Sequence, residues 1–145
     1  MKIRIIHLAI IILFLLLLLY TSISKLSDYK GFVSEMQQSP LLKIVPGSIA
    51  WAFPMLELIT ACMLATKQFR LKGLYLCSTI MAVVTVYVIC ISQFTYYIPC
   101  SCGGLLDLLP QNVHIGVNIV LLILAILGVV LEKSVKETYK NDYYN

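Results

Sequence analysis

The sequence predicts an all-α integral membrane protein, a four-helix bundle with an amphipathic helix at its outer interface. The first observation is composition: 60% of the 145 residues are hydrophobic and 12% are charged, whereas a soluble domain carries about 25% charged residues. The second is the continuity of four apolar runs, which do not alternate as the strands of a membrane β-barrel do. We therefore expect residues 1–145 to form one membrane domain in contact with lipid. The net charge of +4 is spread along the chain, so no basic stripe indicates a nucleic-acid partner.

Each apolar run is close to the ~20 residues that a helix needs to cross ~30 Å of hydrocarbon. The first run follows Lys2 and Arg4 and so also has features of a signal peptide. Because it exceeds the ~7–15 apolar residues of such a peptide, we expect it to be retained as a membrane helix. The runs cover about residues 5–23, 44–65, 74–96 and 113–131, and they leave 132–145 as a cytoplasmic tail.

Positive charge near the ends of membrane helices marks the cytoplasmic side. Lysine and arginine gather at the amino-terminus, in the turn between the second and third runs, and in the tail: Lys2, Arg4, Lys67, Arg70, Lys72, Lys133, Lys136 and Lys140. The loop from 99 to 112 contains neither residue type. We therefore predict a multi-pass protein of a bacterial inner membrane, with both termini in the cytoplasm and this loop outside.

Residues 24–43, between the first two runs, are too polar to cross a membrane. Apolar side chains recur there at steps of three and four residues, as on a helix with one apolar face: Leu26, Tyr29, Phe32, Val33 and Met36. We expect this helix to lie in the outer interface and to end before Pro40. It can cover the mouth of the bundle or act as a lid over the cysteines of the second outer loop.

The second run contains two residues that a membrane helix rarely carries. Pro54 removes a backbone donor and is expected to bend the helix. Glu57 follows one turn later and must face the bundle interior, because a charge in lipid is costly. Glu57 can carry a proton or contact a quinone-like ligand, or it can bond the hydroxyl of Thr60, of Ser48 or of a neighbouring helix, or Asn118. Lys25, at the outer end of the first run, is expected to extend to the interface.

Cys100 and Cys102 stand one residue apart in the second outer loop, on the side where disulfides persist. A disulfide between them would close a very small, strained ring, and strained, exposed disulfides are labile and oxidising. Gly103 and Gly104 follow, and they permit a sharp turn. Thiol–disulfide exchange, a structural disulfide and a Cu(I) site on two thiolates all fit the pair. We do not favour a metal, because few other ligands lie nearby.

The remaining cysteines lie within apolar runs. Cys62, Cys77 and Cys90 are each expected to behave as a small buried hydrophobe. Cys90 precedes Cys100 by ten residues, so it is also a possible relay if the chain folds back.

The order of these motifs resembles the methylamine-utilisation protein MauE family, part of a wider DoxX-like group of redox-associated four-helix membrane proteins. The resemblance rests on Lys-Leu-x-Asp with a following phenylalanine, on Pro-x-x-Glu in the second run, and on Cys-x-Cys-Gly-Gly after the third. The corresponding positions are Lys25, Phe32, Pro54, Glu57, Cys100, Cys102 and Gly104. Gly103 stands where the family usually has an aromatic residue.

The resemblance implies a role in the redox maturation of periplasmic proteins, with Cys100 and Cys102 as the redox pair and Glu57 as a buried acid. The partner would be a periplasmic thiol or disulfide protein, and a quinone or Cys90 would exchange electrons with the pair. The resemblance does not imply that methylamine is involved. The alternatives are a non-catalytic membrane assembly subunit, whose Cys-x-Cys turn is a structural clip, and a small transporter.

Overall fold

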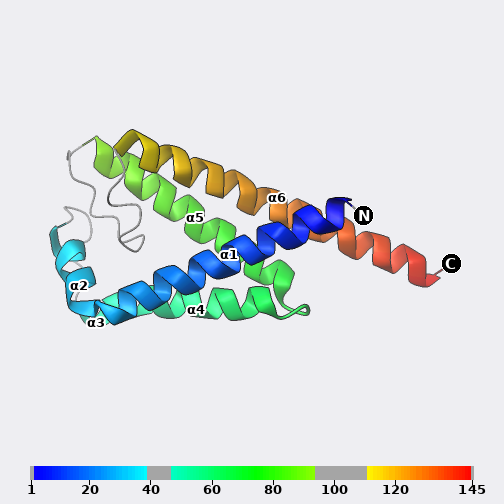
Figure 1. Ribbon diagram of the computed structural model, residues 1–145, viewed down its shortest axis with the longest axis horizontal. Coiled ribbons are helices and arrows are strands. Elements are labelled where there is room, and N and C mark those ends of the chain that lie inside the picture. Colours follow the sequence, from blue (N-terminus) through cyan, green and yellow to red (C-terminus); the bar gives the residue numbers. More distant parts are fainter. Residues whose placement is uncertain (1, 39–46, 94–110, 145) are drawn as a thin grey trace.

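The computed structural model describes residues 2–38, 47–93 and 111–144, and these ranges contain helices and no strand. The predicted all-α fold class is thereby confirmed. The helices are α1 (Lys2–Ser27), α2 (Tyr29–Gln38), α3 (Gly47–Ala50), α4 (Ala52–Ala65), α5 (Arg70–Ser92) and α6 (Gln111–Tyr144). Figure 1 shows both chain termini at one end of the molecule and α2 at the other. We call these the termini end and the α2 end.

Among the described residues, three helices are long and apolar enough to cross a membrane: Arg4–Ser27, Arg70–Cys90 and Asn112–Glu137. They correspond to the first, third and fourth predicted runs, so these helices are those of a membrane protein. The second run differs, because α4 has only 14 residues and part of the run lies outside the described residues. A fourth membrane span therefore stays a prediction.

Pro54 explains where α4 begins. The expectation was a bend within one continuous helix, whereas the structure has a break at Trp51 between α3 and α4. Pro54 is the third residue of α4 and is fully buried. The first turn of a helix has backbone N–H groups without intrahelical acceptors, so proline is tolerated there.

The four helices α1, α4, α5 and α6 pack side by side. α1 contacts α4 and α6, and α5 contacts the same two helices. Their shared core is apolar and consists of Ile10, Phe14, Leu18, Ala61, Leu64, Cys77, Met81 and Ala125. Many apolar side chains point outward instead, among them Leu16, Val83 and Ile126. Such a surface is unfavourable in water and is suited to lipid contact.

Small residues bring the helices close together. A Cβ at Gly73 of α5 would lie 2.8 Å from Leu64 Cδ1 and 3.1 Å from the Leu64 backbone nitrogen of α4. The backbones of α4 and α5 therefore approach more closely than any larger residue at position 73 would allow. Glycine at helix contacts is common in membrane proteins, where association depends on close packing.

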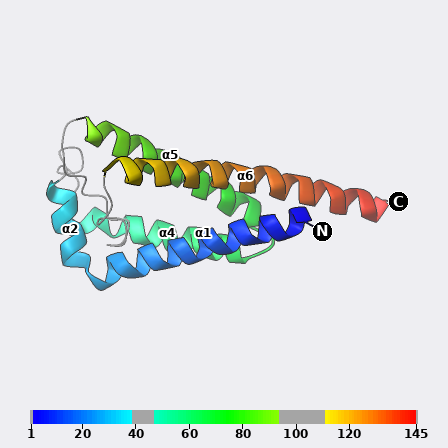
Figure 2. The ribbon, with the colours of Figure 1, turned by 45° about the horizontal axis from the view of Figure 1, so that its top comes forward.

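α2 folds across the end of the packed helices (Figure 2). It begins later than the predicted stretch 24–43, because α1 continues to Ser27. Asp28 separates the two helices and caps α2: its Oδ1 accepts a hydrogen bond from the Gly31 N–H at 3.1 Å. The apolar face of α2 buries Phe32 and Met36 against Ala50. The interfacial position of α2 in a membrane stays a prediction.

At the opposite end, α6 is longer than expected. The predicted tail 132–145 continues the helix as far as Tyr144. Glu132 and Lys136 are four residues apart on it, with Lys136 Nζ 3.8 Å from Glu132 Oε1. Pairs of this spacing support a helix, so the polar tail can extend α6 after its apolar part ends.

Candidate functional site

A buried ion pair joins α1 and α4 at the α2 end. Lys25 lies in the last turn of α1, and Glu57 lies in the second turn of α4. Lys25 Nζ donates to Glu57 Oε1 at 2.5 Å, and the two side chains are 12% and 13% exposed. The expectation that Lys25 extends to the interface is therefore wrong, because its ammonium group turns inward to meet the carboxylate.

Two further side chains complete this group, which we call the α2-end cluster: Thr21, Lys25, Phe32 and Glu57. The Thr21 hydroxyl lies 3.2 Å from Glu57 Oε2 and 3.2 Å from the Leu18 carbonyl oxygen, both acceptors. The Phe32 ring of α2 lies over the ammonium group of Lys25, with its centroid 5.7 Å from Nζ. A cation is favoured over an aromatic face, so α2 covers the ion pair with a side chain that suits it.

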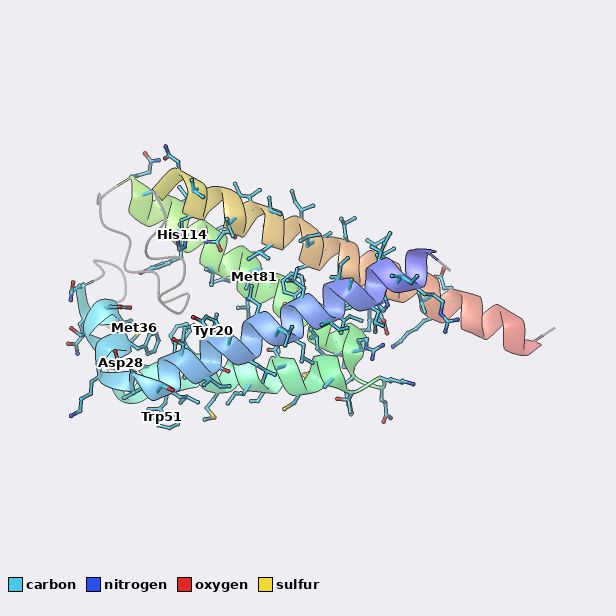
Figure 3. All side chains as sticks on the ribbon, in the orientation of Figure 1. Tyr20, Asp28, Met36, Trp51, Met81 and His114 are labelled. Atoms are coloured by element: carbon cyan, nitrogen blue, oxygen red, sulfur yellow. The ribbon has the colours of Figure 1, made fainter. Side chains whose placement is uncertain are left out.

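Tyr29, the first residue of α2, lies beside the cluster and also holds α2 in place. The Tyr29 hydroxyl donates to the Gly47 carbonyl oxygen. The Tyr29 ring packs on Trp51, with centroids 5.5 Å apart and planes tilted by 46°. Figure 3 shows Asp28, Met36 and Trp51 around this end of the molecule. The ion pair is thus positioned by the ends of α1 and α4 and covered by an anchored α2.

Cys100, Cys102 and Gly104 lie outside the described residues, as does Gly103. Their flanking helices are described: α5 ends at Ser92 and α6 begins at Gln111. Both of these helix ends lie at the α2 end (Figures 1 and 2). The segment that carries the two cysteines therefore leaves α5 and enters α6 at the same end as the α2-end cluster.

The three other cysteines have free thiols. Only Cys77 is buried in the core, as was expected of all three. Cys62 and Cys90 are exposed. A thiol is apolar enough to face lipid without cost, which explains why the apolar neighbours of these cysteines in the sequence did not predict burial.

Asn118 and His114 lie one turn apart near the start of α6, and they are 3% and 4% exposed. Figure 3 shows His114 near the α2 end of α6. Asn118 was one expected partner of Glu57. Glu57 instead bonds Lys25 and Thr21. Sequence reasoning also allowed Thr60 as a partner, but its hydroxyl donates to the Leu56 carbonyl at 2.7 Å.

A second buried contact between titratable side chains, at the termini end, was missed by sequence reasoning. His7 Nε2 of α1 lies 2.8 Å from Glu132 Oε2 of α6, and the side chains are 6% and 5% exposed. Residue 132 was assigned to a solvated tail, and residue 7 was treated as part of an apolar run. The available signal was their position, because the first and last helices bring residues 7 and 132 to the same end.

Within the described ranges, no group of three or more His, Cys, Asp or Glu side chains could hold a metal ion. The chemistry that these ranges offer is that of a shielded carboxylate and ammonium group. Such a pair can hold helices together, and it can also give or accept a proton at a site where water is scarce.

Comparisons with known proteins confirm the resemblance that the motifs suggested. A search of curated proteins and a search of solved structures returned no match. The family model described as methylamine utilisation protein MauE matches residues 3–131, a range that begins in the first turn of α1 and ends within α6. The chain therefore belongs to the MauE family.

Proposed function

We propose that this MauE-family membrane protein carries out thiol–disulfide exchange with a periplasmic protein, using Cys100 and Cys102 as the exchanging pair. The observation that supports this most is that the buried Lys25–Glu57 pair lies at the end of the helices where α5 ends and α6 begins, the two helices that flank Cys100 and Cys102 in the sequence (Figure 1). Buried charges within a membrane are rare and commonly functional.

The exchange needs no further reagent. A thiolate of the partner attacks one sulfur of the Cys100–Cys102 disulfide, forms a mixed disulfide and releases the other sulfur as a thiolate. The partner's second thiol then attacks the mixed disulfide. The partner gains a disulfide, and Cys100 and Cys102 are left as two thiols after proton uptake. The same steps run in reverse if the partner arrives oxidised.

Within this proposal each family-motif residue has a role. Glu57 is the buried acid, and Lys25 balances its charge. Phe32 covers the pair, Pro54 sets the start of α4 and hence the position of Glu57, and Gly104 lets the chain turn after the cysteines. The helices form a four-helix membrane bundle with α2 at the outer interface.

The proposed orientation places the α2 end in the periplasm and both termini in the cytoplasm of a bacterial inner membrane. Basic residues of α1, α5 and α6 support it, because they gather at the termini end: Arg4, Arg70, Lys72, Lys133 and Lys136. Positive charge favours the cytoplasmic side. This orientation would put Cys100 and Cys102 where partner thiols can form disulfides.

The second candidate is a non-catalytic assembly subunit with a structural Cys-x-Cys clip. It is favoured by the engagement of Glu57 with both Lys25 and Thr21, which a purely structural contact between α1 and α4 would also produce. The two candidates differ in how readily the cysteine pair opens, since a structural disulfide resists mild reductant.

The test is differential thiol trapping in intact spheroplasts. A membrane-impermeant maleimide is applied before and after a mild dithiol, and the labelled cysteines are identified by mass spectrometry. We expect labelling of Cys100 and Cys102 only after reduction. The purified protein should oxidise a dithiol peptide, and Cys100→Ser or Cys102→Ser should abolish this, while Cys62→Ser, at another exposed thiol, serves as the matched control. Full activity of Cys102→Ser would refute the two-cysteine mechanism, and a pair that never opens would favour the clip.

A further inference from the structure

We propose that Asn118 is the hydrogen-bond donor of a site for a membrane quinone, which takes electrons from the cysteine pair. The site itself is inferred from the described residues of α5 and α6. Its use as an electron acceptor rests on the proposed function.

The amide of Asn118 is the observation that points to a ligand. The side chain is 3% exposed. Within the part of the chain that the structure describes, its Nδ2 is buried and has no hydrogen-bond partner. Buried amide donors are almost always paired, and hydrocarbon offers no water to replace a missing partner. A donor kept in this position therefore points to an acceptor that the described residues do not supply.

Two other polar side chains toward this end, Thr85 and Glu57, already have hydrogen-bond partners. Thr85 is seven residues from the end of α5 (92 − 85), and Asn118 is seven residues from the start of α6 (118 − 111), so they lie at a similar depth. The Thr85 hydroxyl donates to the Met81 carbonyl oxygen at 2.6 Å. Glu57 accepts hydrogen bonds from Lys25 and Thr21. These groups do not supply the acceptor that Nδ2 requires.

The surroundings determine the class of ligand. Asn118 is uncharged and lies seven residues inside α6, in the stretch Asn112–Glu137 that is long and apolar enough to cross a membrane, and the outer faces of α5 and α6 are apolar. A charged ligand would lose its hydration there without an opposite charge at Asn118 to replace it. The ligand is therefore neutral and apolar, with an exposed acceptor oxygen. A quinone carbonyl and a lipid ester carbonyl share this chemistry.

The redox chemistry favours the quinone. If Cys100 and Cys102 are left as thiols after exchange, their return to a disulfide releases two electrons and two protons. A quinone accepts both and becomes a hydroquinone, so atoms and electrons balance without another reagent. A lipid ester cannot do this. The hydrogen bond from Asn118 would orient one quinone carbonyl and stabilise the oxygen as it gains negative charge.

The test is quinone binding to the full-length protein in quinone-free nanodiscs. Binding of decylubiquinone is followed by quenching of the fluorescence of Trp51, the single tryptophan. Asn118→Leu should raise the Kd about tenfold, the effect of one hydrogen bond in a water-poor site. Thr85→Val is the matched control at the same depth, and its Kd should equal that of the wild type. Solvent extraction of the protein purified from membranes should yield quinone from the wild type and less from Asn118→Leu.

Three results would overturn the site. If the wild-type protein neither binds decylubiquinone nor carries quinone, the quinone site is excluded. This result does not depend on the stability of the variants. An equal loss of binding in Asn118→Leu and Thr85→Val would indicate altered packing. Native mass spectrometry that finds a phospholipid lost only from Asn118→Leu, with unchanged quinone binding, would assign the amide to a lipid ester.

A variant without the two loop cysteines separates this inference from the proposed function. The double variant Cys100→Ser with Cys102→Ser should bind decylubiquinone with the wild-type Kd. If that holds while the wild type shows no dithiol oxidation, the quinone site stands and the exchange function fails. If dithiol exchange occurs without quinone binding, the exchange function stands and the site at Asn118 fails.

Discussion

Removing one member of the Lys25–Glu57 pair should destabilise the protein far more than removing both. The ions are 2.5 Å apart with side chains 12% and 13% exposed. At an effective dielectric constant of ~20, their attraction is about 7 kcal/mol before desolvation, and desolvation offsets much of it. Lys25→Met leaves the carboxylate buried without its counter-charge, which costs about 3–5 kcal/mol. The double variant Lys25→Met with Glu57→Leu leaves no buried charge and should lie within about 1 kcal/mol of the wild type.

The assay is a double-mutant cycle on the free energy of unfolding. The protein is unfolded reversibly in lipid–detergent micelles with a denaturing detergent, and the fluorescence of Trp51 reports the transition. Trp51 suits this purpose because it packs on Tyr29 beside the cluster. Lys30→Met is the control, since Lys30 is an exposed lysine of α2 and its removal should change stability by no more than ~0.5 kcal/mol.

The cycle should give a coupling free energy of about 3 kcal/mol or more between positions 25 and 57. A coupling below ~0.5 kcal/mol would contradict this account. It would mean that Lys25 is solvated in the membrane and that Glu57 does not depend on its charge. The structural role assigned to the α2-end cluster would then be wrong, regardless of any catalytic role.

Three other predictions use the same unfolding measurement or one close to it. Gly73→Ala should destabilise by about 1–3 kcal/mol, because its Cβ meets α4 at 2.8–3.1 Å. Gly116→Ala is the control: nothing lies within 4 Å of its new Cβ, so it should stabilise by about 0.5–1 kcal/mol. Equal effects of the two substitutions would contradict the close approach of α4 and α5. Asp28→Ala should lower the hydrogen-exchange protection of α2 by about 1 kcal/mol, and unchanged protection would exclude the cap. Glu132→Leu should cost about 1–3 kcal/mol because it leaves the buried His7 ring without its polar partner, and adding His7→Leu should restore most of this loss.

The parts of the fold that could be predicted are those that depend on local composition. α1, α5 and α6 follow from long apolar runs, because hydrocarbon length alone requires about 20 such residues. The apolar face of α2 follows from spacing, and Phe32 and Met36 are indeed buried. The break before α4 could also have been inferred from Pro54, whose place is favoured in the first turn of a helix rather than in the middle of one.

The buried pairs Lys25–Glu57 and His7–Glu132 could not be predicted, because they depend on how the helices are rotated about their axes. Lys25 and Glu57 are 32 residues apart, and the sequence gives the depth of each in its helix but not the direction in which it points. A terminal lysine in lipid can extend to the interface or turn inward at similar cost. Only the presence of a carboxylate at the matching depth on the adjacent helix decides this. Asn118 shows the same limit, because its depth suggested a contact with Glu57 that the packing does not make.

The two buried polar pairs, His7–Glu132 and Lys25–Glu57, have the same structural consequence for α1, and this helps to separate structure from function. His7–Glu132 fixes the start of α1 to α6, and Lys25–Glu57 fixes its end to α4. An apolar core lies between them, so α1 is held at both ends. If holding helices together were the whole role, the two pairs would need similar surroundings. The α2-end pair instead carries an added hydroxyl from Thr21 and an aromatic cover from Phe32, and it lies where the cysteine-bearing segment joins the helices. Since helix packing requires neither feature, the α2 end is the part of this protein where chemistry is best sought.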